Sequence, residues 1–410
     1  MRTPNNQRMA RRDFLKTAAT VAAGITIVRP QAVRGSEANS TIELGIVGSG
    51  GRGVWLGDLF NKNSNIKVVA LADPFADRLK NGQEKLGVAA DRCYKGLNGY
   101  KELIASGVDA VAIESPPYFH PEQTMAVVDA GKHVYLAKPV AVDVPGCKTI
   151  VAAGEKAKGK VCFLVDFQTR ADAVFQEAFQ RIVAGDIGAP VCGEAFYHCS
   201  RLGNDSLKPT TNDADRLRYW VFDKKLSGDI IVEQNVHSLD VANWFLRGNP
   251  VKAFGTGGRK ARTNIGDCWD HFICTFWYPD DVLIDFNSTQ FLKGYAYQMR
   301  HDICARIFGT RGTVDSHYAG RVAITGEKEW DGGVNEGLYG SGAIENIKTF
   351  EKDIRAGNNK ANNAVESTNS SLTTILGRMA AYEQRIVTWD EMMKSTERFE
   401  VELKLDEDKT

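Results

Sequence analysis

Between Thr41 and about Phe167 the chain alternates short apolar runs with amphipathic stretches. The apolar runs cover residues 42–47, 66–72, 109–114, 133–137 and 161–165. Continuous runs of this length are typical of strands that are buried on both faces of a parallel sheet. The amphipathic stretches lie near residues 52–61, 75–86, 121–130 and 144–157. They predict crossover helices, and the alternation as a whole predicts a doubly wound α/β domain over residues 39–168.

Beyond Val191 the apolar positions recur at every second residue instead. This pattern is found at residues 191–198, 251–257, 271–278, 282–288 and 303–308. Period-two alternation is typical of strands with one buried face. Residues 169–410 are therefore expected to form an α+β domain with an open, largely antiparallel sheet.

Three helices are expected in this second domain. The first runs from about Asp229 to Leu246. The others lie near residues 343–356 and 371–386, the last with Ser370 and Ser371 as its caps. The helical spacing of these segments contrasts with the alternation around them, so the domain should combine both kinds of element.

Two segments of the second domain carry no clear periodicity. Residues 331–342 are rich in glycine and predict little regular structure. Residues 201–225 are polar and long for a connection, which is typical of a functional loop or a disordered one. Tyr219 and Trp220 lie in this second segment, which we expect to decide specificity, and are predicted substrate contacts.

The first apolar run leads into a G-x-G-x-x-G sequence made by Gly48, Gly50 and Gly53. In that order the glycines allow a tight turn, a close approach to a pyrophosphate and close packing of the following helix on the sheet. Asp73 ends the second apolar run, where a carboxylate accepts from the ribose hydroxyls. The predicted cofactor is NAD, because Asp73 would repel a 2′-phosphate; Arg78 could reverse that preference. The loop residues Gly51 and Arg52 belong to the predicted cofactor site.

Polar residues follow three further strands at the edge where a doubly wound sheet binds ligands. Ser115, Pro116 and His120 follow the third run and are predicted to contact the cofactor, although His120 could equally serve packing. Lys138 follows the fourth run and is predicted to contact it too. Gln168 and Arg170 follow the last run; they could touch substrate hydroxyls, or Arg170 could form a structural ion pair.

The first 38 residues are predicted to be an export signal. Arg11 and Arg12 precede Phe-Leu-Lys and a short apolar run from Thr17 to Val28, which suits a twin-arginine signal better than a membrane span. The protein is therefore expected to engage the twin-arginine export machinery, to be periplasmic and to have no stable membrane span. Because that route exports folded proteins, the cofactor should be loaded first and held tightly.

Charge and cysteine usage argue against nucleic-acid binding and against a cysteine-based metal or redox site. The chain has 51 basic and 51 acidic residues, so nucleic acid is not an expected partner. Its eight cysteines form no C-x-x-C motif, and those in apolar runs, such as Cys162 and Cys274, are expected to be buried thiols. His198 and Cys199 could be grouped with Glu233 and His237, but the spacing is unlike a standard metal site, and no metal is predicted.

Taken together, several motifs resemble the Gfo/Idh/MocA (glucose–fructose oxidoreductase, inositol dehydrogenase) family of oxidoreductases. The resemblance runs from about Glu43 to about Met392. Besides the glycine loop, Asp73 and His120, it rests on the segments 130–134 (AGKHV), 137–139 (AKP), 233–240 (EQNVHSLD) and 308–315 (FGTRGTVD). It implies a Rossmann domain, an open-sheet domain that often builds homo-oligomers, and hydride transfer between a nicotinamide and a sugar or polyol carbon.

The resemblance also implies roles for individual residues. Lys138 matches the lysine beside nicotinamide and substrate, His237 matches the general base, and Glu233 stands at the aspartate of the same motif. The sequence departs from the family pattern at Ala137, which replaces a glutamate, and at Asn235, which replaces a glycine. These departures could change how Lys138 is oriented and how closely the substrate approaches.

The spacing of these residues suggests how they could work. Glu233 and His237 are four residues apart, so on one helix their Cβ atoms would be about 5–6 Å apart. The carboxylate could then fix the tautomer of the imidazole, which would accept the proton of a hydroxyl. Lys138 would favour the negative charge that develops on the same oxygen. Asp240, a turn later, could assist His237 or contact substrate, or simply hold the helix.

The leading hypothesis is an exported NAD-dependent oxidoreductase acting on a carbohydrate or cyclitol hydroxyl. A second hypothesis is an NAD-dependent glycoside hydrolase or lyase that oxidises the sugar transiently and reduces it again. A third is a non-catalytic protein that binds NAD or senses carbohydrate. The presence of both Lys138 and His237 argues against the third.

Overall fold

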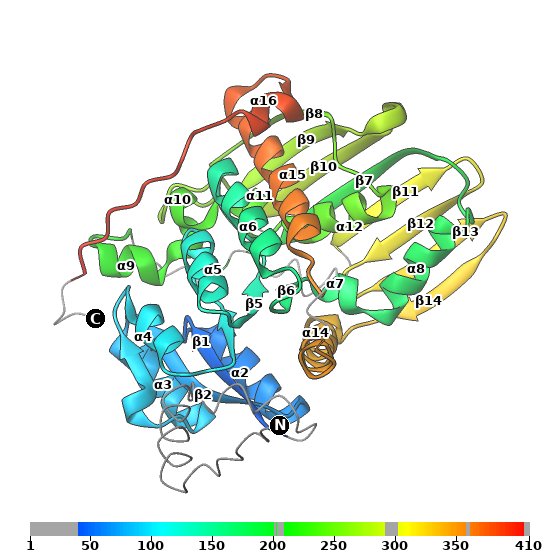
Figure 1. Ribbon diagram of the computed structural model, residues 1–410. Helices are drawn as coiled ribbons and strands as arrows, with labels where there is room; N and C mark the ends of the chain where they lie inside the picture. Colours follow the sequence, from blue (N-terminus) through cyan, green and yellow to red (C-terminus); the bar gives the residue numbers. More distant parts are fainter. Residues whose placement is uncertain (1–39, 201, 203–208, 292–301, 358–360, 406–410) are drawn as a thin grey trace, which may run out of the picture. The chain divides into compact units, whose positions relative to one another are not determined.

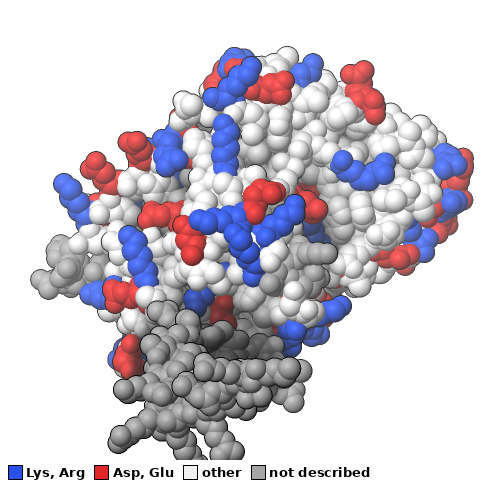
Figure 2. Space-filling view, viewed as in Figure 1, with Lys and Arg blue, Asp and Glu red and all other residues white. Residues whose placement is uncertain are grey.

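The computed structural model describes residues 40–200, 202, 209–291, 302–357 and 361–405. The predicted export signal lies outside these residues. None of the described helices is long and apolar enough to cross a bilayer. Figure 2 shows lysine and arginine interspersed with aspartate and glutamate over the visible face, as the balanced composition leads one to expect.

The first part of the described chain forms a parallel sheet of six strands in the order β3-β2-β1-β4-β5-β6. The strands are β1 (Ile42–Val47), β2 (Ile66–Asp73), β3 (Cys93–Lys95), β4 (Ala110–Ile113), β5 (His133–Ala137) and β6 (Phe163–Asp166). Its helices are α2 (Gly51–Asn63), α3 (Ala76–Leu86), α4 (Gly99–Ala105), α5 (His120–Asp129) and α6 (Val144–Ala157). The apolar runs become strands because most of their residues are buried; all four residues of β4 are inaccessible. The predicted doubly wound fold is confirmed.

The second sheet has nine described strands in the order β14-β13-β12-β11-β7-β10-β9-β8-β15. They are β7 (Pro190–Cys199), β8 (Lys252–Gly258), β9 (His271–Trp277), β10 (Leu283–Gln290), β11 (Ile303–Gly309), β12 (Gly312–His317), β13 (Arg321–Gly326), β14 (Trp330–Val334) and β15 (Val387–Thr388). Only the β7–β10 pair is parallel among the described pairings. The prediction of a largely antiparallel sheet is confirmed.

Helices cover one face of this second sheet. They include α8 (Ala173–Val183), α12 (Val236–Leu246) and α15 (Ala364–Glu383). Figure 1 shows α15, in orange, running between α6 and the strands of the mixed sheet. Helix α14 (Leu338–Arg355) also returns to the first domain, where it packs against α2 and β6. The C-terminal helices therefore join the two sheets, and the boundary at residue 168 stays a prediction.

Three predictions of local structure are wrong. The helix expected over 229–246 is broken into α11 (Ile230–Glu233) and α12. Helix α15 begins after Asn363, so Ser370 and Ser371 are buried inside it, where they bond to Asp240 and to a carbonyl one turn earlier. The glycine-rich segment 331–342 contains most of β14 and the first turn of α14, because its small residues permit close packing. For α15, tertiary burial rather than local polarity decided where the helix begins.

The described part of the polar segment 201–225 is ordered into short helices. They are α9 (Asp213–Arg218), a 3₁₀ turn (Trp220–Phe222) and the start of α10 (Lys224–Ser227). Leu217 and Leu226 from these helices bury Phe75, which follows β2. The segment therefore lies against the carboxyl edge of the parallel sheet.

Candidate functional site

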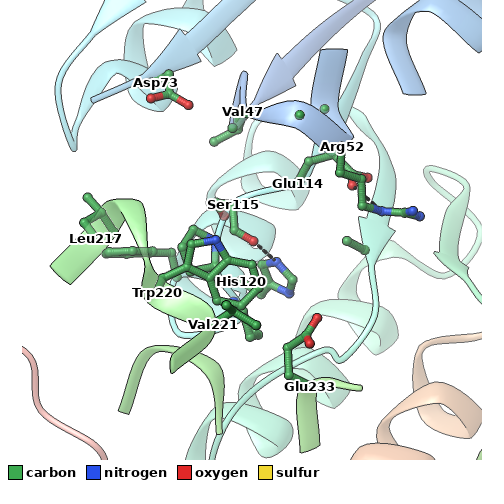
Figure 3. A pocket seen from close by; sticks show the side chains of 18 of the residues that line it. Val47, Arg52, Asp73, Glu114, Ser115, His120, Leu217, Trp220, Val221 and Glu233 are labelled. Atoms are coloured by element: carbon green, nitrogen blue, oxygen red, sulfur yellow. Dashed lines mark hydrogen bonds and ion pairs between the residues drawn. The ribbon is translucent and has the colours of Figure 1, made fainter. Parts of the chain in front are cut away.

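A cavity of about 550 Å³ opens at the carboxyl ends of β1, β2, β4 and β5 and extends to the start of α12 (Figure 3). Most of the predicted site residues line it. They are Gly48, Gly50, Gly51, Arg52, Gly53, Asp73, Ser115, Pro116, His120, Lys138, Gln168, Trp220, Glu233 and His237. Residues that were more than 150 positions apart in the sequence thus share one pocket.

The glycine loop has the shape that a dinucleotide requires. Gly48 has φ +97°, and a Cβ there would lie 2.7 Å from the backbone of Glu114. A Cβ on Gly53 would lie 1.9 Å from the carbonyl oxygen of Gly48, so glycine is needed for α2 to start this close to β1. By contrast, a Cβ on Gly51 would meet no atom within 4 Å. The first turn of α2 therefore faces open space, and helix geometry gives its N–H groups no acceptor within the helix, which fits a pyrophosphate.

Asp73 braces this loop from the end of β2. Its Oδ2 accepts from the backbone N–H of Ser49 at 2.8 Å, and its Oδ1 accepts from the backbone N–H of Phe75 at 2.9 Å. Burial raises the pKa of the carboxyl, while these amides and Arg78 lower it. Both oxygens keep lone pairs for further donors. The contact with ribose stays a prediction, and the brace is an additional role.

His120 joins two walls of the pocket. Its Nε2 lies 2.8 Å from the carbonyl oxygen of Ser115, and its Nδ1 lies 2.9 Å from that of Pro139. Burial lowers the pKa of the imidazole to about 4, so the ring is neutral and donates to one of the two carbonyls. The ring lines the pocket and also holds together the segments that shape it. A cofactor contact and a packing role, the two roles considered for His120, are therefore compatible.

Lys138 points at the short helix α11. Its Nζ donates to the backbone carbonyl of Glu233 at 2.7 Å and lies 3.4 Å from Oε1 of the same residue. Both side chains are largely buried. Burial lowers the pKa of the ammonium, and the Glu233 carboxylate opposes that effect. Glu233 is thus the partner of Lys138.

The predicted hydrogen bond between Glu233 and His237 is wrong. The chain leaves α11 at Glu233 and enters α12 at Val236, so the two residues do not share a regular helix face. The Nδ1 atom of His237 has no hydrogen-bond partner within the described residues. Its ring lies between those of Tyr197 and Tyr318, with centroids 6.5 and 5.3 Å away. Packing, rather than a carboxylate, holds the imidazole at the pocket.

The groups around His237 influence the pH dependence of a reaction in which this residue accepts a proton. Burial, followed by the positive charges of Lys138 and Arg52, holds the pKa of His237 well below its usual range. A base must be neutral to act, and a lowered pKa keeps the ring neutral to lower pH. We expect kcat/KM for alcohol oxidation to be flat below neutrality and to decline only below about pH 6.5, the ordinary histidine value. A pH–rate profile between about pH 5 and 8 tests this; an acid limb centred at or above the ordinary value would contradict it.

Arg170, Asp240 and Tyr219 were predicted to contact substrate, but none of them lines the cavity. Arg170 donates to Asp240 through Nε at 3.0 Å and through Nη2 at 2.9 Å. Asp240 is wholly buried and accepts also from Ser370 at 2.6 Å. The pair is an internal ion pair that ties α7 (Gln168–Ala171) to α12 and α15. Tyr219 is 38% exposed on the surface. These three predictions are corrected.

The sequence did not predict the cluster of charged residues around Arg52. Arg52 was predicted for its place in the loop, but its side chain pairs with Glu114 at 3.1 Å and with Asp166, and it donates to the hydroxyl of Tyr339 at 2.9 Å. Figure 3 shows Arg52 beside Glu114. A signal was present, because both acids stand at the carboxyl ends of parallel strands.

One other cluster could be considered for a cation. Cys304, Asp315 and His317 come together on β11 and β12. However, Oδ1 of Asp315 lies 3.1 Å from both Arg306 Nε and His317 Nε2. The guanidinium already takes the place of a cation at this carboxylate.

Comparison with known proteins agrees with this geometry. Residues 42–166 match the oxidoreductase family with an NAD-binding Rossmann fold, and residues 175–315 match the GFO/IDH/MocA C-terminal domain. A myo-inositol 2-dehydrogenase of Thermotoga maritima is 25% identical over 364 residues, which is 86% of this chain and 100% of that protein. Matches to other inositol 2-dehydrogenases cover 57%, 65% and 55% of those proteins.

Solved structures share the fold over most of the chain. The scyllo-inositol dehydrogenase from Lactobacillus casei, solved with NAD(H) and scyllo-inositol, has a TM-score of 0.66 and 19% identity and covers 86% of this chain and 100% of its own. The aldose-aldose oxidoreductase from Caulobacter crescentus, complexed with glycerol, has a TM-score of 0.68 and 17% identity, covering 85% and 100%. With both family domains matched and the glycine loop in place, the chain belongs to the GFO/IDH/MocA family of NAD-binding oxidoreductases.

Proposed function

We propose that this protein oxidises a hydroxyl-bearing carbon of a cyclitol or sugar. The observation that carries the proposal is the convergence of Lys138 and His237 on the same cavity as the glycine loop. The relatives named inositol 2-dehydrogenase support a cyclitol or a related polyol as substrate.

The residues divide the chemistry between them. NAD, when bound, supplies the hydride acceptor. His237 is neutral and accepts the proton of the reacting hydroxyl, which general-base catalysis needs. The Lys138 ammonium donates a hydrogen bond to the same oxygen and favours its developing negative charge. Glu233 holds Lys138 through its backbone carbonyl and its carboxylate. In the reverse direction His237 returns the proton to the oxygen.

We further propose that the cofactor is held tightly. Leu217 and Trp220 line the cavity from a segment that is fastened to the parallel-sheet domain. Arg218 of that segment pairs with Asp77 of α3 at 2.7 Å, and its guanidinium lies 3.9 Å from the centroid of Phe75. The C-terminal tail adds contacts, because the N–H of Val401 donates to Tyr118 and that of Lys404 to Asp213. A cofactor enclosed by this segment would leave slowly.

A substrate panel tests the reaction. Purified protein is offered cyclitols, aldoses and simple glycosides while the absorbance of the bound nicotinamide is followed. Reduction of the cofactor with formation of a keto-polyol supports the proposal. Release of free sugar from a glycoside with no accumulated NADH would instead indicate a redox-neutral hydrolase. Denaturing the purified protein tests retention, since a tightly held cofactor should appear in the supernatant at close to one equivalent.

Export by the twin-arginine route is also proposed, from the sequence of the first 38 residues. Replacing Arg11 and Arg12 by lysine should keep the protein in the cytoplasm, because the machinery reads the arginine pair. Fractionation of cells that express either form measures this. An equal periplasmic yield from both forms would contradict the proposal.

Self-association through the open face of the mixed sheet is proposed on the family resemblance. Phe254, Ile273 and Leu283, on the neighbouring strands β8, β9 and β10, are 41%, 54% and 38% exposed on that face. Large exposed apolar side chains on one face are typical of an interface. Light scattering after gel filtration should give at least a dimer, and Ile273→Lys should lower that mass.

A further inference from the structure

Gln234 lies between the two residues that hold the proposed chemistry in place. It follows Glu233, whose backbone carbonyl accepts from Lys138 at 2.7 Å. The backbone carbonyl of Gln234 itself accepts from the N–H of His237 at 3.3 Å. Gln234 also lines the same cavity as Lys138 and His237. The break between α11 and α12 therefore brings a neutral amide side chain to the part of the cavity where a polyol would react.

The carbonyl end of this amide is held by the ends of two neighbouring strands. Gln290 and Cys199 are the last residues of β10 and β7 and are paired in their register. Nε2 of Gln290 donates to Oε1 of Gln234, and Sγ of Cys199 lies 3.9 Å from the same oxygen. Burial, followed by the charge of Glu233, raises the pKa of the Cys199 thiol to about 12, so the thiol is protonated and donates too. Two donors directed at one atom assign that atom as the oxygen of the amide.

The other end of the amide is available to a ligand. Within the part of the chain that the structure describes, Nε2 of Gln234 has no acceptor, and the atom is accessible rather than buried. Gln290, by contrast, is only 1% exposed, and its Oε1 has no partner among the described residues. Burying an amide that is only half paired is costly. The hydrogen bond that Gln290 donates to Gln234 gives this costly side chain a role at the site.

We propose that Gln234 is a substrate-binding residue whose Nε2 donates to a second hydroxyl of the polyol, and that Gln290 is a positioning residue that orients it. The inference rests on the proposed function and adds one determinant of specificity to the same site. A hydroxyl suits this position because its oxygen accepts from an amide N–H without introducing a charge. An amide that is already held at one end loses little freedom on binding, so the contact should discriminate against a polyol that lacks this hydroxyl.

Affinity measured without turnover tests the contact. Protein that carries NADH has no oxidant for a polyol, so calorimetry with myo-inositol gives a dissociation constant separate from the reaction. Gln234→Leu should weaken binding about 3- to 10-fold, the usual effect of one neutral hydrogen bond. It should leave kcat within about twofold, because the contact is made equally before and during the reaction. Gln180→Leu, at an exposed position of α8, is the matched control and should change neither quantity.

The monodeoxy derivatives of myo-inositol identify the hydroxyl that is contacted. For one isomer, the loss of the hydroxyl and the change Gln234→Leu should not add, so the variant should bind that isomer as tightly as the unaltered protein does. Gln290→Leu should also weaken the binding of myo-inositol, but it should weaken it no further when Gln234→Leu is already present. This lack of additivity separates a positioning role from a general structural one.

Two further measurements keep the test decisive. Thermal midpoints show which variants are folded, and Gln234→Asn, which keeps the amide but withdraws it by one methylene, should weaken binding as Gln234→Leu does. An unchanged affinity in both Gln234 variants would overturn the inference, and an additive loss in the double variant would overturn the role of Gln290. If the unaltered protein binds myo-inositol but reduces no cofactor with it, the proposed function fails, while the affinities still decide the role of Gln234.

Discussion

Replacing His237 by alanine will lower kcat for polyol oxidation by about 10²- to 10⁴-fold, the usual contribution of a general base. The affinity for NAD will change little, because the rings that His237 packs against, those of Tyr197 and Tyr318, belong to the second domain. Steady-state kinetics gives the first quantity, and titration of protein freed of its cofactor gives the second.

His271 offers a matched histidine control for this experiment. It lies on β9 and is absent from the cavity lining. His271→Ala should leave kcat within about twofold of the original value. If His237→Ala retained turnover, the assignment of the base would be refuted. If both variants lost activity together with their thermal stability, the loss would be one of folding, and kinetics below the midpoint temperature would be needed for the comparison.

Replacing Arg170 by leucine will lower the free energy of unfolding by about 3–5 kcal/mol, the cost of leaving a buried charge without its partner. Asp240 is completely buried and depends on Arg170 and Ser370 for its hydrogen bonds. Urea denaturation measures the change. KM for the polyol should be unaffected in the protein that remains folded, because neither member of the pair lines the cavity.

Arg321 and Asp331 form a pair of the same chemical kind on the surface, with side chains 57% and 60% exposed. Arg321→Leu should leave the urea midpoint close to that of the unaltered protein, because water solvates the remaining carboxylate. A rise in KM with unchanged stability in Arg170→Leu would restore the substrate role that the sequence suggested.

The sequence determined the parallel sheet and the cofactor loop by itself. Continuous apolar runs are stable as strands only when both faces of the sheet are covered. The order of glycines between β1 and α2 is specific to the turn of a dinucleotide-binding domain. The short strand β3 and the broken helix at Glu233 were not predicted, since three residues carry too little periodicity and a break of two residues leaves no mark in the pattern. The serine and threonine residues of α15 form a polar pattern in the sequence, but in the structure most of them are buried.

For the site, too, local sequence and tertiary structure decided different features. Lys138 and His237 were found because each stands in a local motif, and their meeting in one cavity follows from the fold of both domains. The partner of each charge could not be found locally. Glu233 contacts Lys138, 95 residues away, and Arg170 contacts Asp240, 70 residues away, because an ion pair depends on distance in space and not on spacing along the chain. The local sequence thus determined which groups are present and on which elements, whereas only the tertiary structure decided which of them neutralise one another and which remain free for chemistry.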